Sequence, residues 1–403
     1  MVLPAGSGPY SVGVMEVDVP CVSTKAGIVP VVIYYPCEAD SGKEDMVWMP
    51  AETAKGLGES QLADVFGESL GAFLMGVFAP LATGRCKVRA LRMGKPFLPE
   101  NGRAQWPTAV FSHGLTAWRH VNSSFCVEVA SFGAVVLAVE HCDGSAASAT
   151  ASETLEEEVV DQGGWSFRNK KTQQKKKKKT LAKFVSWDRN KKPELEKLEG
   201  DAMKAGRDWR HRQVDQRVNE LHAALDGANA AIDRIFFASA PKANYCRVDG
   251  DVAVLGQSFG GATAASCFQE DSPRSKRFSR AMLYDPWIEG KGQDIAPMRP
   301  EVFHRTTDSL QRLDIWRNGK ATLWNLSKDN TETLAANSCQ NSFFHDEMDC
   351  GHFAQTDVEV VFKSGPLAFF YTALKSSGKH EPDALEVLNR TRKQTIDALD
   401  GWF

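Results

Sequence analysis

The sequence predicts an α/β fold with a mostly parallel central sheet and helices on both of its faces. Three short apolar runs, at residues 108–112, 134–139 and 252–255, have the composition of buried strands. Helix-like segments separate the runs, and polar residues follow each run directly. An open parallel sheet requires this alternation and presents its chemistry at the carboxyl ends of its strands. A length of 403 residues allows one large α/β domain or two smaller ones, and 42% hydrophobic residues are ample for a core; we expect one domain over residues 1–403.

The chain is predicted to open with two antiparallel strands. Residues 10–20 contain several β-branched side chains, and residues 28–35 form an apolar run that ends at Pro36. Residues 38–60 are polar and rich in turn-forming residues, which favours a loop.

An apolar stretch with helical spacing follows at residues 62–81. It carries no charge from Ser69 onwards. It is too short and too rich in glycine to span a bilayer, which needs about 18–20 apolar residues. Two interpretations stay open: a helix of the core or of a lid, and an interfacial helix that lies on lipid.

Residues 163–208 interrupt the alternation of strands and helices. This segment includes five consecutive lysines at residues 175–179 and few apolar side chains, so we expect a mobile, Lys-rich surface insertion. Attraction to an anionic membrane surface is the alternative role. Nucleic acid is not an expected partner, because no aromatic residues for base stacking are regularly interleaved.

The second half of the chain returns to the α/β pattern. Apolar residues recur at helical spacing over residues 210–237, and this helix leads into the strand at 252–255. Further strands are predicted at 281–284 and 321–326. The segment 343–351 leads to His352, and the tail beyond Pro366 has helical periodicity.

Composition narrows the class of protein. A net charge of −3 does not indicate nucleic-acid binding, and nine scattered cysteines without a Cys-x-x-Cys pair favour free thiols in a reducing compartment. The first residues lack the features of a signal peptide, and Val2 excludes N-myristoylation. We therefore expect a cytoplasmic protein, peripheral at membranes, with no cofactor and no metal.

The strongest motif is Gly-Gln-Ser-Phe-Gly at residues 256–260, directly after a predicted strand and before a run of small residues. This spacing predicts a strained strand–turn–helix in which Ser258 is exposed as a nucleophile. The turn also places the amide of Phe259 at a helix N-terminus, where it can stabilise an oxyanion.

A serine nucleophile requires a base and an acid that orients the base. In hydrolases of the α/β type the acid and then the histidine follow the serine along the chain. Asp285 ends a predicted strand and His352 lies in a late, glycine-containing loop, so the predicted triad is Ser258, Asp285 and His352. The rival groups, which lack this setting, are the acids Asp294, Asp314 and Asp329 and the bases His304 and His345.

The second oxyanion amide should come from the loop after the strand that ends at Ser112. Residues 113–115 form that loop, and we predict that the amide of Leu115 completes the oxyanion hole. His113 is expected to brace the loop. His141, Asp143 and Ser145 crowd one strand end, where we expect a supporting hydrogen-bond network.

Several blocks together resemble the platelet-activating-factor acetylhydrolases, in their plasma and intracellular type II branch (lipoprotein-associated phospholipase A₂-like). These blocks cover residues 8–10, 35–37, 111–115, 140–146, 216–218, 256–263 and 285–287. The resemblance extends over most of the chain outside the basic insertion. It implies an α/β-hydrolase fold, the triad Ser258, Asp285 and His352, and oxyanion amides at Leu115 and Phe259.

The resemblance also implies a calcium-independent serine hydrolase that removes acetyl or short, oxidised sn-2 acyl groups from phospholipids. The family rests an apolar helix on lipid, a place taken here by Phe73, Leu74, Val77 and Phe78. Two alternatives stay open. A broad carboxylesterase or lipase would share the catalytic residues, and a lipid-surface binding module would carry only a vestigial site.

Overall fold

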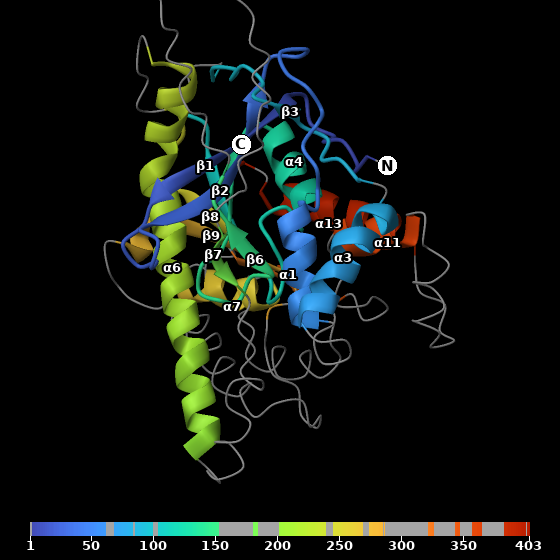
Figure 1. Ribbon diagram of the computed structural model, residues 1–403. Coiled ribbons are helices and arrows are strands. Elements are labelled where there is room, and N and C mark those ends of the chain that lie inside the picture. The colour runs from blue at the N-terminus through green and yellow to red at the C-terminus, as the bar shows by residue number, and fades with distance from the viewer. Residues whose placement is uncertain are drawn as a thin grey trace, which may run out of the picture.

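A sheet of nine strands runs through the part of the chain that the structure, a computed structural model, describes (Figure 1). Its order is β11-β10-β9-β8-β4-β5-β2-β1-β3. The bounds of these strands in chain order are β1 Ser11–Pro20, β2 Ile28–Cys37, β3 Leu91–Arg92, β4 Thr108–Ser112, β5 Val135–Val139, β8 Val252–Gln257, β9 Phe278–Tyr284, β10 Ala321–Asn325 and β11 Phe343–Asp346.

The described residues are 2–61, 68–83, 85–99, 104–152, 180–183, 201–238, 245–268, 274–284, 286, 321–325, 343–346, 357–364, 383–399 and 401–403.

The pairing of the strands confirms the α/β fold with a mostly parallel sheet. β2 runs antiparallel to both of its neighbours, β1 and β5. The strands β5, β4, β8, β9, β10 and β11 are parallel to one another. Parallel neighbours need long crossover connections, usually helical, and these cover the two faces of the sheet. The order of the central strands, with β4 between β5 and β8, is that of the α/β-hydrolase fold expected from the sequence.

Helices cover both faces of this sheet (Figure 1). The long helix α6 lies on one face, and α1, α3, α4, α11 and α13 lie on the other. The helix bounds are α1 Ala51–Gln61, α3 Glu68–Ala82, α4 Ser123–Ser131, α6 Asp201–Phe236, α7 Phe259–Ser266, α11 Asp357–Ser364 and α13 Ala384–Ala398.

Alternation along the strands divides the core into two layers. Val17 and Val31 face the layer that α6 covers, with Leu221 and Leu225 of that helix. On the opposite face, Val14 of β1 packs in the layer that contains α4 and α13. Because successive side chains of a strand point to opposite faces, one strand supplies both layers.

Helix α1 corrects the sequence prediction of a loop over residues 38–60. This segment is helical because two of its glycines pack closely against the backbone of other segments. A Cβ on Gly58 would lie 2.1 Å from the carbonyl oxygen of Gly71 in α3, and one on Gly56 would lie 2.3 Å from the carbonyl oxygen of Ala147. Glycine weakens an isolated helix, but here it permits close contacts that stabilise the helix in its place.

The predicted insertion at 163–208 contains two described elements. Strand β7 (Thr180–Lys183) pairs antiparallel with β6 (Ser148–Thr150), and the ammonium of Lys183 lies 2.9 Å from the carboxylate of Glu59 in α1. Helix α6 begins at Asp201, before the predicted start at residue 210. The lysine run lies outside the described residues, so the predicted mobility of the insertion stays a prediction.

The described helices include none with both the length and the apolar character needed to cross a membrane.

The five-residue strands β4 and β5 are buried at every position, as the apolar runs predicted.

A buried carboxyl group joins α11 to the N-terminus of α4. One oxygen of Asp357 accepts hydrogen bonds from the Ser124 amide and the Ser123 hydroxyl, both at 3.1 Å. Burial raises the pKa of Asp357 from its ordinary value of 3.8 to about 6, although the bonds from the two serines oppose the shift. The folded protein therefore holds this proton at a pH where the unfolded chain releases it.

We predict a pH-dependent contribution of Asp357 to stability. Because its pKa is raised by folding, the contribution is complete below about pH 4 and is lost as the pH rises through 6. Asparagine keeps the acceptor but cannot ionise. Relative to Asp357→Asn, the wild type should lose up to roughly 3 kcal/mol of unfolding free energy between pH 4 and pH 7.

Urea unfolding of both proteins across this range measures the difference. Asp383→Asn, which replaces an exposed carboxylate that caps α13, controls for the loss of a charge. Parallel profiles for the wild type and Asp357→Asn would contradict the prediction.

Candidate active site

Ser258 occupies the sharp turn between β8 and α7, as the sequence predicts. Its backbone has φ 54° and ψ −119°, a strained conformation for a residue other than glycine. The turn is held from both sides: the Ser258 amide donates to the Tyr284 carbonyl at 3.0 Å, and the Ser258 carbonyl accepts from the Gly261 amide at 2.9 Å. The side chain is partly exposed at the carboxyl end of the strand.

The glycine after this turn allows the helix to approach β4. A Cβ on Gly260 would lie 2.0 Å from the carbonyl oxygen of Ser112, the last residue of β4. No larger residue fits this contact without displacing backbone. The motif therefore serves two purposes, a strained serine and a close approach of α7 to the neighbouring strand.

The loop after β4 lies directly beside the serine. A Cβ on Gly114 would lie 3.3 Å from the Cβ of Ser258 and 2.5 Å from the side-chain oxygen of Gln257. The next residue, Leu115, is half-buried, and Phe259 begins α7. The structure thus places the backbone of Gly114, the residue before Leu115, beside Ser258, and Phe259 directly follows Ser258; the catalytic roles of Leu115 and Phe259 stay predictions.

His113 holds the peptide that carries the Leu115 amide. Its Nδ1 lies 2.8 Å from the Gly114 carbonyl oxygen, and its Nε2 lies 3.3 Å from the His141 amide. The tautomer with the proton on Nδ1 satisfies both bonds. Because a peptide unit is planar, fixing the Gly114 carbonyl also fixes the direction of the Leu115 N–H. The predicted bracing role of His113 is confirmed.

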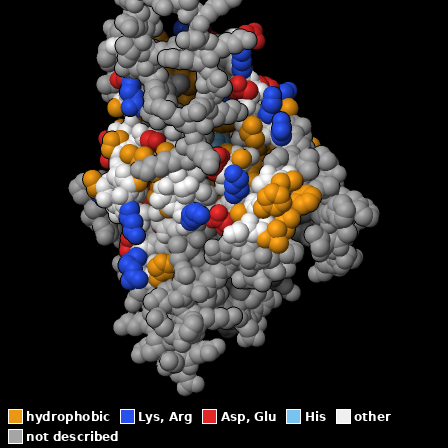
Figure 2. All heavy atoms as spheres, in the orientation of Figure 1, with side chains coloured by type: hydrophobic (Ala, Val, Ile, Leu, Met, Phe, Trp, Pro, Cys, Tyr) orange, Lys and Arg blue, Asp and Glu red, His pale blue; other side chains and the backbone are white. Residues whose placement is uncertain are grey.

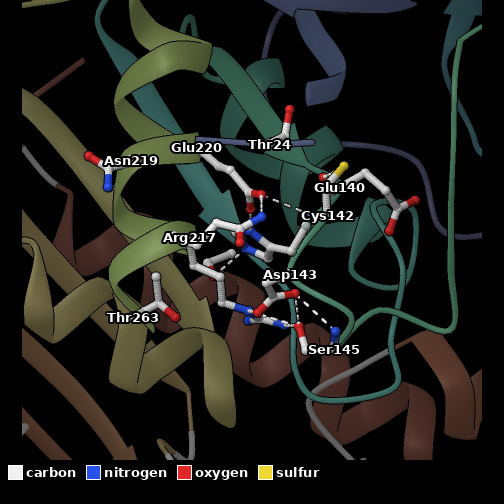
Figure 3. Close-up of polar contacts among 12 residues, drawn as sticks. Thr24, Glu140, Cys142, Asp143, Ser145, Arg217, Asn219, Glu220 and Thr263 are labelled. Carbon is white, nitrogen blue, oxygen red and sulfur yellow. Dashed lines mark hydrogen bonds and ion pairs between the residues drawn. The ribbon is translucent and has the colours of Figure 1, made fainter. Parts of the chain in front are cut away.

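A buried network behind the loop links it to α6 (Figure 3). The Arg217 guanidinium donates to the His113 carbonyl at 2.7 Å, to the Asp143 carboxylate at 3.0 Å and to the Ser145 hydroxyl at 2.5 Å. Its carbon also lies 4.5 Å from the centre of the Phe259 ring. The predicted network at Asp143 and Ser145 is confirmed, and its centre is an arginine.

A second set of contacts has the order of a catalytic triad but lies in the interior. The Ser112 hydroxyl is 2.8 Å from His141 Nε2, and His141 Nδ1 is 2.7 Å from a carboxylate oxygen of Glu220. All three side chains are inaccessible to solvent. Burial, together with the charges of Arg217 and His113, lowers the pKa of His141 well below its ordinary value. These three enclosed side chains lie out of contact with solvent, in the interior behind the loop.

The other two members of the predicted triad, Asp285 and His352, lie outside the described residues. Tyr284, which precedes Asp285, pairs with Gln257, the residue before Ser258. The rival groups Asp294, Asp314, Asp329 and His304 also lie outside, and His345 lies in β11. The assignment of acid and base stays a prediction.

Arg217 and Glu220 were absent from the predicted site. The sequence feature that could have identified them is their position on the helix α6. Arg217 falls between Val214, Val218 and Leu221, on the face that the helix buries against the sheet. A charged residue inside an apolar helical face needs a partner, and that need indicates a polar site beneath the helix.

The predicted lipid-facing residues lie on α3, where Figure 2 shows a group of hydrophobic side chains. Phe73 is 65% exposed, Phe78 50% and Val77 45%. Leu74 is less exposed than these three, because its side chain is half-buried. Leu70, 48% exposed, extends the group by one turn of the helix. We call Leu70, Phe73, Val77 and Phe78 the α3 patch. Exposure of several large apolar residues on one helix indicates a contact surface.

Among the residues that the structure describes, no group of three or more His, Cys, Asp or Glu side chains is placed to hold a metal ion.

Comparison with known proteins identifies related chains. The model of the family "Platelet-activating factor acetylhydrolase, isoform II" matches residues 1–309. Platelet-activating factor acetylhydrolase of Cavia porcellus is 28% identical over 312 residues, which cover 74% of this chain and 58% of that protein. The Bos taurus protein of the same name is 27% identical, with the same two coverages. That of Gallus gallus is 26% identical over 96% of this chain and 81% of its own length.

The chain thus spans less than two thirds of the length of the mammalian relatives. The family match nevertheless covers every strand of the sheet except β10 and β11, together with the His113–Leu115 loop, Arg217 and the Ser258 turn. With this match added to the strand order and the turn geometry, the resemblance seen in the sequence is confirmed: the chain belongs to the platelet-activating factor acetylhydrolase isoform II family.

Proposed function

We propose that this protein is a calcium-independent serine hydrolase that removes acetyl or short, oxidised sn-2 acyl groups from phospholipids. The observation that carries the proposal is the strained Ser258 turn directly beside the Gly114–Leu115 loop. A nucleophile next to two backbone amides is the arrangement that acyl transfer requires. Membership of the family supports the substrate class.

In the proposed mechanism His352, oriented by Asp285, removes the proton of Ser258 as the serine attacks the ester carbonyl. The amides of Leu115 and Phe259 bind the oxyanion of the tetrahedral intermediate. His352 then protonates the departing lyso-lipid oxygen. Water attacks the acyl-enzyme by the same route, which releases the acid and restores the serine.

The α3 patch is the proposed contact with membranes or lipid aggregates. An apolar helix face in the headgroup region would let a lipid reach the enzyme without fully entering water. A peripheral location at cytoplasmic membranes is part of this proposal.

The first prediction concerns Ser258 and the length of the acyl chain. We expect the wild type to hydrolyse phosphatidylcholine with an sn-2 acetyl group much faster than with palmitoyl, in the presence of a calcium chelator. Ser258→Ala should lower the rate by a factor on the order of 10⁶, because it removes the nucleophile.

Initial rates over a series of sn-2 chains measure this, and a fluorophosphonate probe should label the wild type at Ser258 alone. Equal rates for short and long chains would move the enzyme to a general esterase or lipase. Absence of both turnover and labelling would favour a lipid-binding module without activity.

The second prediction concerns the acid. Asp285→Asn should lower kcat by about 10⁴-fold without unfolding the protein, because the histidine loses its orientation and its counter-charge. The rival acids supply matched controls: Asp294→Asn, Asp314→Asn and Asp329→Asn should each retain near-normal kcat. A rival variant that loses activity while Asp285→Asn retains it would reassign the acid.

The third prediction concerns the α3 patch. Phe73→Ser with Phe78→Ser should weaken binding to phosphatidylcholine vesicles by roughly 100-fold or more, because each of the two buried phenyl rings contributes about 1.5–3 kcal/mol. Hydrolysis of a water-soluble acetyl ester should not change. Vesicle sedimentation in the Ser258→Ala background measures the binding.

Leu385→Ser is the matched control, because Leu385 is an exposed apolar residue on α13, outside the patch. Unchanged vesicle binding of the double variant would contradict the membrane role of α3.

A further inference from the structure

We propose that Arg217 is a positioning residue that holds both halves of the oxyanion hole in register. The inference rests on the proposed function, because it assigns the support of the two amides at Leu115 and Phe259. Arg217 does not touch substrate. It acts through the backbone and the ring to which it binds.

The first half of the hole is held through the backbone of the loop. Arg217 donates to the His113 carbonyl at 2.7 Å, and His113 in turn holds the Gly114 carbonyl at 2.8 Å. Two successive peptide carbonyls are thereby fixed, and the next N–H is that of Leu115. A planar peptide whose carbonyl is fixed has little freedom to rotate its N–H.

The second half is held through a side chain. The guanidinium carbon of Arg217 lies 4.5 Å from the centre of the Phe259 ring. Phe259 is fully buried and supplies the other amide. A cation over an aromatic face is attractive, and the attraction increases when both groups are removed from water. One guanidinium therefore contacts both the loop after β4 and the residue that follows Ser258.

The arginine is itself fixed on its remaining sides. Its donors reach the Asp143 carboxylate at 3.0 Å and the Ser145 hydroxyl at 2.5 Å, and its side chain is inaccessible to solvent. The carbonyl of Ser145 accepts from the Thr116 amide at 2.7 Å, which ties down the residue after Leu115. A planar group with several donors in fixed directions suits this role, whereas an ammonium group cannot satisfy all these acceptors at once.

The test compares Arg217→Lys with the wild type. We expect kcat per active site to fall by roughly 10- to 100-fold, because small displacements of oxyanion donors are costly, while KM changes little. Active sites are counted by complete titration with a fluorophosphonate, so a fraction of unfolded protein does not affect the result.

A second readout separates positioning from a merely structural role. A trifluoromethyl ketone analogue adds reversibly to Ser258, and its hemiketal oxygen takes the place of the oxyanion. Its inhibition constant should rise in parallel with the loss of kcat/KM. Binding of the lyso-phospholipid product, which has no such oxygen, should be unchanged.

Two further variants complete the design. Ser145→Ala removes one hydroxyl acceptor but leaves the backbone contact to Thr116, so it gives a milder change of the same kind should Arg217→Lys fold poorly. Arg392→Lys is the matched control: Arg392 is also a buried arginine, but it binds Glu128 and the Ala5 carbonyl and not the His113–Leu115 loop. It should alter stability without altering kcat per active site.

Unchanged kcat and ketone inhibition in both Arg217→Lys and Ser145→Ala, with an active wild type, would overturn this inference and leave the proposed function intact. Equal losses in Arg392→Lys would also overturn it. A wild type without turnover that depends on Ser258 would overturn the inference and the proposed function together.

Discussion

The contact between the start of α7 and the end of β4 determines the arrangement of the whole site. At Gly260 the two backbones approach so closely that even a methyl group would collide with the Ser112 carbonyl. This contact fixes the position of the Ser258 turn relative to the loop that follows β4. The parallel order β5, β4, β8, β9 then brings the ends of all these strands to one edge of the sheet. A polar site at that edge follows from the topology.

The polar residues behind the loop show how such an edge is kept rigid. Burial of an arginine and several acids is costly unless their hydrogen bonds and charges are paired. Here α6 supplies Arg217 and Glu220, and the loops supply the histidines and further partners. Arg217 donates to the His113 carbonyl, whereas Glu220 accepts from the Cys142 amide and contacts the His141 imidazole. Such a network stabilises the loop in one arrangement only, because a buried polar group that loses its partner destabilises the protein more than an apolar contact in its place would.

The sequence predicted the strands and the Ser258 turn well, because local rules govern both. A run of β-branched residues defines a strand, and Gly-x-Ser-x-Gly defines the turn. It failed at α1, where glycine contacts with α3 and the residues after β5 decide the structure, and these depend on segments far apart in the chain. It also missed Arg217 and Glu220 as parts of the site. The apolar face of α6 indicates a buried polar site, but most partners of these two residues lie more than 70 residues away, so the local pattern does not identify the members of that site.

The dependence of Asp143, Ser145 and Arg217 on one another also limits how the sequence can change. Replacing the arginine alone leaves a carboxylate in the interior without its counter-charge, and replacing Asp143 alone leaves a guanidinium in the same state. Either single step passes through a less stable protein. Evolution along this lineage is therefore expected to retain the three residues as a unit or to exchange them together. Related chains with a different residue at one of these positions should carry compensating changes at the other two.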